Sequence, residues 1–263
     1  MTTGVFPLTV NQPVTRLVDV LTRHQEPRWA ETLIVDGRNR ATLICAPEGT
    51  PGDPHLHPDY NEWWVILGGE TTFQIGEYEP VIAREGDIVV APVGHRHDIV
   101  PSKGQRCLRL VVGPPWSNHD LKGVAPSRLV PVHQGLEPPN LIHTPLDWML
   151  ERHGRQKAWA EEVILDDRNR ANLIYQLPGE TNRPHWHPDF DEWWVVLKGE
   201  LTWSIGNKAP VTARKGDIVF AEAGFRHAIS TAGNESSIRL AVTIPGVRHV
   251  FTEGDRSAPP PKT

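Results

Sequence analysis

Two sets of residues in this sequence have the side chains of a metal site. The first set consists of three histidines and one glutamate, His55, His57, Glu62 and His97. The same residue types return at the same spacing as His185, His187, Glu192 and His227. Three imidazole nitrogens and one carboxylate oxygen suit transition metals better than Ca or Mg, which prefer all-oxygen shells. We therefore predict one divalent transition metal per set, with Fe or Mn as the first choices and Ni, Cu, Zn or Co as alternatives.

Local structure explains how such residues could meet. Alternate side chains of an extended strand share a face, so His55 and His57 point the same way. A Pro-Asp turn follows them, and Glu62 then opens the next apolar run beside the two imidazoles. His97 comes after a turn that closes a further β-like run. These spacings predict that each set converges on the inner face of a β-structure.

The two sets belong to a sequence duplication. The segment WAETLIVDGRNRATLI from Trp29 returns as WAEEVILDDRNRANLI from Trp159, and HPDYNEWWVILGGE from His57 returns as HPDFDEWWVVLKGE from His187. The separation is 130 residues in both pairs. Each copy has short apolar runs bounded by Gly, Pro, Asp and Asn, which is typical of antiparallel strands. The sequence therefore predicts two copies of one β-sandwich or barrel module.

Flanking segments set the expected domain limits. Helical patterns precede the modules, VTRLVDVLTRH from Val14 and PLDWMLERH from Pro145, and a stretch rich in Pro, Gly and Ser joins the copies between 113 and 140. We expect an N-terminal domain at 1–125 with a core of about 29–112. A C-terminal domain at 126–263 would have a core of about 159–242.

Composition narrows the functional classes. The 263 residues include 38% apolar residues, which is enough for a folded core, and the formal charge of −5 comes without any basic run. Because nucleic-acid binding needs clustered Lys and Arg, we expect no nucleic-acid partner. No apolar stretch approaches the roughly 20 residues that span a bilayer, and the beginning of the sequence lacks a leader pattern. With Cys45 and Cys107 expected as buried reduced thiols, we predict a cytoplasmic protein without a membrane partner.

The spacing of these residues resembles a known family. Both blocks of the first copy are similar to the two signature motifs of the cupin superfamily: Gly49, His55, His57, Glu62 and Gly69, then Gly86, Pro92, Gly94 and His97. The second copy keeps the spacing but has Glu222 at the proline position, and both copies lack the asparagine that often closes the second motif. The resemblance covers most of 30–112 and 160–242. It implies an all-β bicupin, with two tandem cupin jelly-roll barrels, short flanking helices and a metal in each barrel mouth.

Four further residues are candidates for substrate binding. Trp64 and Trp194 lie two residues beyond each glutamate, so they share its face and should line a cavity, although tryptophans also simply fill cores. Arg109 and Arg239 are embedded in apolar runs. An inward guanidinium would bind a carboxylate in a bidentate manner and would indicate an acidic substrate.

The copies differ near the predicted ligands. His95 becomes Phe225 and Tyr60 becomes Phe190, so the first site has more groups that can exchange protons. We therefore take His95 and Tyr60 as candidate proton relays, with a solvent-facing position as the alternative for His95.

Four protein ligands on an ion that prefers six leave about two positions open for substrate, water or dioxygen. We predict a metal-dependent bicupin enzyme that acts on a small organic acid or an enolisable carbonyl compound, with a dioxygenase as the leading hypothesis. One alternative is a redox-neutral isomerase, decarboxylase, lyase or hydrolase, and another is a non-catalytic bicupin that binds a small ligand or metal. The expected partners are a small-molecule substrate and dioxygen, and assembly into a homo-oligomer is left open.

Overall fold

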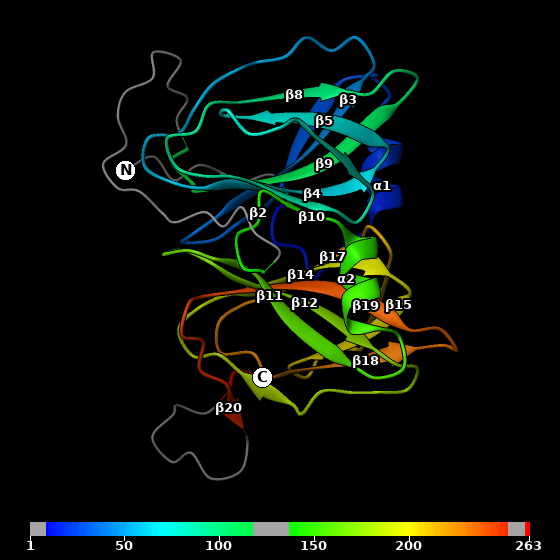
Figure 1. Cartoon of the computed structure of the whole chain (residues 1–263). Helices are drawn as coiled ribbons and strands as arrows, with labels where there is room; N and C mark the ends of the chain where they lie inside the picture. Colours follow the sequence, from blue (N-terminus) through cyan, green and yellow to red (C-terminus); the bar gives the residue numbers. More distant parts are fainter. Residues whose placement is uncertain (1–8, 118–136, 252–260) are drawn as a thin grey trace. The chain divides into compact units, whose positions relative to one another are not determined.

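The computed structural model describes residues 9–117, 137–251 and 261–263 (Figure 1). Its contacts divide these residues into two compact units. Unit 1 contains the described residues of Met1–Val10 and His24–His153, and unit 2 combines Asn11–Arg23 with the described residues of Gly154–Thr263. The domain boundary predicted near residue 125 lies outside the described residues.

Unit 1 is built from antiparallel strands and one helix. One sheet has six strands in the order β10-β7-β4-β9-β3-β2, and a second has three in the order β6-β5-β8. Its elements are β2 (Trp29–Val35), β3 (Arg40–Pro47), β4 (Glu62–Gly68), β5 (Glu70–Ile75), β6 (Val81–Arg84), β7 (Ile88–Ala91), β8 (His97–Pro101), β9 (Arg106–Gly113), β10 (His143–Thr144) and α2 (Leu146–His153).

Unit 2 repeats this plan. Its larger sheet has the order β1-β17-β14-β19-β12-β11, and its smaller sheet the order β16-β15-β18-β13-β20. Its elements are β1 (Val14–Thr15), α1 (Leu17–Arg23), β11 (Trp159–Leu165), β12 (Arg170–Gln176), β13 (His185–Trp186), β14 (Glu192–Lys198), β15 (Glu200–Ile205), β16 (Val211–Arg214), β17 (Ile218–Ala221), β18 (His227–Ala232), β19 (Ser237–Thr243) and β20 (Val250–Phe251).

The core of each unit lies between its two sheets. In unit 1, Trp64 and Ile66 of the larger sheet pack with Phe73 and Ile75 of the smaller one. The central strand β4 is buried along nearly its whole length, because its other face is covered as well. This double burial explains why β4 reads as an almost continuous apolar run rather than as an alternating one. The expected all-β fold with two repeated barrel-like halves and short helices is confirmed.

Irregularities of the sheets are duplicated along with the strands. The β2–β3 pairing shifts register between Thr32 and Ile34, and the β11–β12 pairing shifts between Glu162 and Ile164. The turn that joins β2 to β3 is held by Asp36, whose Oδ1 accepts the main-chain N–H groups two and three residues further on at 2.7 and 2.6 Å. The register shifts in β2–β3 and β11–β12 are β-bulges, which fix the register of the paired strands, so both units present the same strand positions to their interiors.

The segment that precedes each module in the chain belongs to the other unit. Strand β1 and helix α1 precede the first module in the chain, yet they belong to unit 2, where Val14 pairs with Val219 of β17. Strand β10 and helix α2 precede the second module and belong to unit 1, where His143 pairs with Val89 of β7. Each larger sheet is therefore completed at one edge by the segment that leads into the other module.

Aspartates anchor both helices at their first turns. The main-chain N–H of Leu17 donates to Oδ1 of Asp217 at 2.9 Å, and that of Leu146 donates to Oδ1 of Asp87 at 3.0 Å. An anionic acceptor satisfies an unpaired donor and interacts favourably with the positive end of a helix. Neither helix of the described chain is long and apolar enough to cross a membrane.

Candidate metal centres

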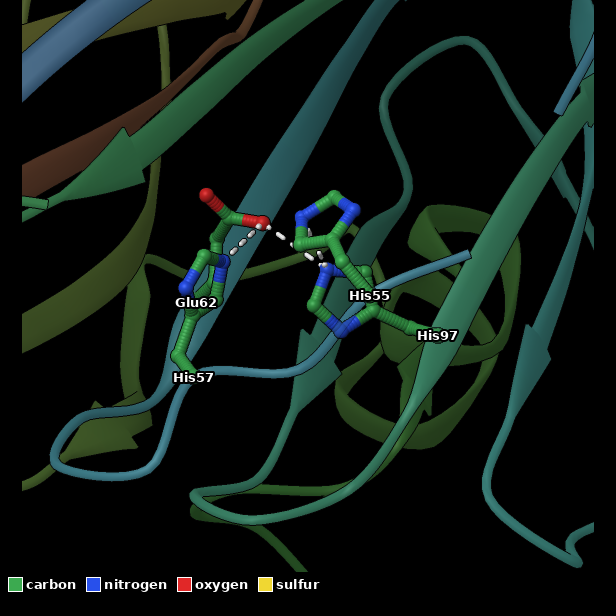
Figure 2. A group of neighbouring side chains, drawn as sticks. All are labelled: His55, His57, Glu62 and His97. Atoms are coloured by element: carbon green, nitrogen blue, oxygen red, sulfur yellow. Dashed lines mark hydrogen bonds and ion pairs between the residues drawn. The ribbon is translucent and has the colours of Figure 1, made fainter. Parts of the chain in front are cut away.

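In each unit, three strands or strand ends carry the predicted ligands to one point. Glu62 is the first residue of β4, His97 is the first residue of β8, and His55 pairs with His97 through main-chain hydrogen bonds of 3.1 and 2.8 Å. The register places His185 opposite His227 in the same way in unit 2. Figure 2 shows the four side chains of unit 1 pointing toward one another.

The ligand atoms of unit 1 are in mutual contact. Oε2 of Glu62 lies 3.3 Å from Nε2 of His57 and 3.1 Å from Nε2 of His97. Nε2 of His97 also lies 3.1 Å from Nε2 of His55. All four ligand atoms are within 4.8 Å of one another, and His57, Glu62 and His97 are buried. This arrangement could hold one metal ion.

Unit 2 reproduces the cluster. Oε2 of Glu192 lies 2.9 Å from Nε2 of His187 and 3.0 Å from Nε2 of His227. Nε2 of His227 is 3.2 Å from Nε2 of His185, and all four residues are buried. The structure thus brings together all four residues of both predicted sets.

The partners of the Nδ1 atoms show which nitrogen of each ligand histidine faces the centre of the cluster. Five of the six histidines direct Nδ1 at a main-chain carbonyl: His55 at Asp53, His97 at His95, His185 at Arg183, His187 at Arg248 and His227 at Phe225, with distances of 2.5–3.3 Å. A carbonyl oxygen can only accept, so in the neutral imidazole these Nδ1 atoms carry the proton and Nε2 presents a lone pair. Lone pairs that converge beside a carboxylate repel one another unless a cation lies among them. The donor set therefore fits a metal ion.

Electrostatics keeps the ligands in the forms that bind a cation. Burial alone would raise the pKa of Glu62 and Glu192, but their contacts with two histidines each outweigh burial and hold the pKa well below its usual range. Burial and the neighbouring His227 ring lower the pKa of His185 to about 4. Both carboxylates are thus ionised and His185 is neutral at pH 7.

Each cluster opens into a cavity. The cavity of unit 1 has a volume of about 530 Å³, and that of unit 2 about 380 Å³. Trp64 lines the first and Trp194 the second, each two positions beyond the ligand glutamate as the strand alternation predicts. Both indoles are almost completely buried, so each also packs in the core of its unit. Cavities of this size accommodate small organic molecules.

Arg109 and Arg239 also line these cavities. Arg239 is only 3% exposed, and Gln176 accepts one hydrogen bond from its Nη1 at 2.5 Å, while its buried Nε has no partner. Arg109 has buried Nε and Nη1 atoms without partners. Within the described part of the chain, neither guanidinium forms an ion pair. Burial lowers the pKa of Arg239 to about 10, so the group is still a cation at pH 7.

The two candidate proton relays occupy different places. Tyr60 is buried, and its hydroxyl lies 2.6 Å from Nδ1 of the ligand His57. His95 stacks on Tyr78 at 5.7 Å between ring centroids and does not line the cavity of unit 1. Its role as a relay stays a prediction.

The segment around β20 also contributes to the site, although it is not among the residues predicted from the sequence. His249 and Phe251 line the cavity of unit 2, and the His249 ring lies 4.6 Å from that of His185 and 5.0 Å from that of His187. A signal existed, because the 130-residue register pairs His249 with His119, and each follows its last ligand histidine by 22 residues. His119 lies outside the described residues.

Comparison with known proteins agrees with this architecture. The family model of the cupin domain matches residues 42–113 and again 173–245, which together make up more than half of the sequence. The chain therefore belongs to the cupin family, and the two matches make it a bicupin. No match is found among curated proteins.

Solved structures show the same fold at low sequence identity. A cupin 2 conserved barrel domain protein from Leptotrichia buccalis is 14% identical with a TM-score of 0.63, and the alignment covers 88% of this chain and 96% of that one. A variant of Bacillus subtilis oxalate decarboxylase is 15% identical with a TM-score of 0.58, covering 87% and 76%. A deletion mutant of that enzyme is 15% identical with a TM-score of 0.60, covering 93% and 80%.

Proposed function

We propose that each barrel binds a divalent transition metal and that the chain is a metal-dependent enzyme acting on a small carboxylic acid. The observation that carries the proposal is the guanidinium that lines each cavity without an ion-pair partner among the described residues, that of half-buried Arg109 in unit 1 and of buried Arg239 in unit 2. A buried cation without an anionic partner is costly. A carboxylate that enters the cavity would relieve this cost through charge-assisted hydrogen bonds.

The ligand set supports a metal from the first transition series, with Fe or Mn first and Ni, Cu, Zn or Co as alternatives. Such a metal supplies a Lewis acid and, if it is redox-active, a means of activating dioxygen. The protein would hold the substrate carboxylate on the arginine, and the indoles of Trp64 and Trp194 would form an apolar wall that keeps water from the reacting end.

The reaction that we put first is dioxygenation of a small organic acid or enolisable carbonyl compound. A redox-neutral reaction, decarboxylation in particular, is the second candidate. It is favoured by the inward arginines, which suit a carboxylate substrate, and by the fold that this chain shares with oxalate decarboxylases. The two candidates differ in a simple observable, because only the first consumes dioxygen in proportion to substrate.

The test is a pair of substitutions, Arg109→Met and Arg239→Met, which keep an unbranched apolar stem and remove the charge. Each should weaken the binding of acetate, oxalate and pyruvate to its own unit by about 10- to 100-fold, as for loss of a charge-assisted hydrogen bond. The metal content should not change. Arg40→Met is the matched control, because Arg40 is exposed at the edge of the unit 1 cavity and bonds Ser117.

Metal-loaded protein would then be supplied with a panel of small carboxylates while dioxygen uptake and carbon dioxide release are recorded. Substrate-dependent uptake would support the dioxygenase, and carbon dioxide release without uptake would support the decarboxylase. Carboxylate binding that depends on both arginines without any turnover would instead indicate a bicupin that binds small ligands. Carboxylate affinities that are unchanged in both arginine variants would contradict the proposal.

A further inference from the structure

The cavities of the two units carry opposite charges at one equivalent position. Asp53 in unit 1 and Arg183 in unit 2 are 130 residues apart, and each lies two residues before the first ligand histidine of its unit. Both residues are exposed, and both line the cavity. The position at the cavity rim is therefore the same in both units, but its charge is reversed.

The main chain fixes this rim position relative to each ligand cluster. The carbonyl of Asp53 lies 2.5 Å from Nδ1 of His55, and that of Arg183 lies 2.8 Å from Nδ1 of His185. In unit 1 the main-chain N–H of Asp53 also donates to Oδ1 of Asp98 at 3.0 Å. A different side chain at position 53 or 183 therefore changes the charge of the rim without replacing a ligand.

Neither rim charge is neutralised by another residue of the described chain. The Asp53 carboxylate has no hydrogen bond or ion pair there. Arg183 forms no ion pair among the same residues, and its guanidinium lies 4.2 Å above the ring of Phe251, which lines the same cavity. Stacking on an aromatic ring holds a guanidinium in place while its N–H groups can still donate to an anion.

The inner arginine of each unit lies on the opposite wall of its cavity. Arg109 and Arg239 come from β9 and β19 of the larger sheets. Asp53 and Arg183 lie beside the smaller sheets, because the histidine two positions further on pairs with β8 or β18. Packed sheets are about 10 Å apart. A small acid can thus place one carboxylate on the inner arginine and present its other end to the rim.

The other charged residues of the cavities preserve this difference. In unit 2, the ligand glutamate is the only acidic residue among the described ones that line the cavity, and Arg170 is already paired with Glu162 at 2.6 Å. In unit 1, Asp53 lines the cavity together with Arg28 and Arg40 at the exposed rim. Apart from the metal ligands, unit 2 presents cations to a bound acid, whereas unit 1 presents charges of both signs.

We propose that the two cavities bind acids of different charge: unit 2 binds a dicarboxylic acid, and unit 1 binds an acid with a distal amino group. Arg183 and Asp53 are the residues that determine this specificity. Arg183 contributes charge-assisted hydrogen bonds to the second carboxylate, and Asp53 accepts them from the ammonium group. The inference rests on the proposed function, because the inner arginine must hold the first carboxylate in both units.

The first experiment isolates each cavity and varies only the far end of the acid. Arg239→Met leaves the inner arginine in unit 1 alone, and Arg109→Met leaves it in unit 2 alone. Butyrate, 4-aminobutyrate and glutarate share one carbon skeleton and carry a hydrogen, an ammonium group or a carboxylate at its far end. Calorimetric titration of the metal-loaded proteins at low ionic strength gives the dissociation constant of each acid.

We expect unit 2 to bind glutarate about three- to tenfold more tightly than 4-aminobutyrate, and unit 1 to show the opposite order, with butyrate between them. The factor is modest because solvent screens charge pairs at exposed positions. Added salt should therefore reduce both preferences, which at about 0.5 M NaCl should nearly disappear.

Three outcomes would contradict the inference. A preference of unit 1 for glutarate, as Arg28 would produce if it outweighed Asp53, would overturn it, and so would preferences that do not respond to salt. Butyrate binding that persists when Arg109→Met and Arg239→Met are combined would overturn the carboxylate sites of the proposed function, and this inference with them.

The second experiment exchanges the rim charges. Asp53→Arg in the Arg239→Met protein should make unit 1 prefer glutarate. Arg183→Asp in the Arg109→Met protein should make unit 2 prefer 4-aminobutyrate. The metal content should stay the same in both, since all four ligands of each cluster are retained.

Glu79→Arg and Lys157→Asp are the matched controls for these exchanges. Each changes the charge of its unit by the same amount, but Glu79 and Lys157 are exposed and line neither cavity. Both controls should leave the order of the three acids unchanged. Circular dichroism and thermal unfolding would show that each variant is folded. A folded Asp53→Arg or Arg183→Asp protein that keeps the original order, or a control that reverses it, would contradict the assigned roles.

Discussion

Unit 1 and unit 2 share the strand order of their larger sheets, their bulges and their four ligands, but the residues around the ligands have diverged. Position 46 in unit 1 is alanine, whereas its counterpart Gln176 accepts a hydrogen bond from Arg239. At the cavity rim, Asp53 of unit 1 corresponds to Arg183 of unit 2, whose guanidinium lies 4.2 Å above the Phe251 ring. The strands therefore fix where a ligand cluster forms, while neighbouring side chains set the size and charge of the cavity that it faces.

The largest expected effect is the loss of metal from one centre while the other keeps its metal. His97→Ala and His227→Ala should each reduce the bound metal from two equivalents to one per chain, because each unit supplies all four of its own ligands. Elemental analysis after gel filtration measures the stoichiometry. Loss of both metals from either single change would show that the centres are not independent.

A second expected effect concerns acid. Burial lowers the pKa of His185 to about 4 in the folded protein from an ordinary value near 6.5. The unfolded chain therefore binds this proton first, and the metal-free protein should lose up to about 3 kcal/mol of stability as the pH falls from 6.5 to 4. Denaturant melts at several pH values would measure the slope. His185→Asn should flatten it, and an equally steep slope in that variant would exclude His185 as its cause.

A smaller effect concerns the aspartates that cap the two helices. Asp217→Ala should destabilise unit 2 by about 1–2 kcal/mol, because it removes the cap of α1 and the ion pair with Arg16. Hydrogen exchange should report the loss in β17 rather than in β7. Asp87→Ala is the matched change and should have the reverse pattern. Faster exchange in β7 after Asp217→Ala would contradict the assignment of α1 to unit 2.

The smallest effect is on the size of the accepted acid. Gln176→Ala should free the head of Arg239 and enlarge the cavity of unit 2, while Ala46→Gln should reduce that of unit 1. We expect the preference among acetate, succinate and glutarate to move by a few-fold, about 1 kcal/mol, in opposite directions. Calorimetric titration of the single-centre proteins measures this shift, and parallel changes in both variants would refute the assignment.

Much of the site follows from sequence because its determinants are local. Strand alternation places Trp64 on the same face as Glu62, and the constant separation of 130 residues predicts the same arrangement for Trp194 and Glu192. The contact of the Arg248 carbonyl with His187 could not be predicted, because every residue type has a main-chain carbonyl. Tyr60 was noticed, but its contact with His57 depends on the turn between them. The placement of α1 in unit 2 depends on contacts between residues about 200 positions apart, such as Leu17 and Asp217.

The crosswise use of β1 and β10 also limits how this chain could be divided. A fragment that ends in the linker would carry β1 and α1 without the sheet edge that they complete, and it would lack the strand and helix that complete its own. Two such fragments produced together could each be whole only by exchanging these segments. An independently expressible single barrel would therefore be a rearranged sequence, in which residues 140–153 are joined ahead of the first module and residues 11–23 ahead of the second.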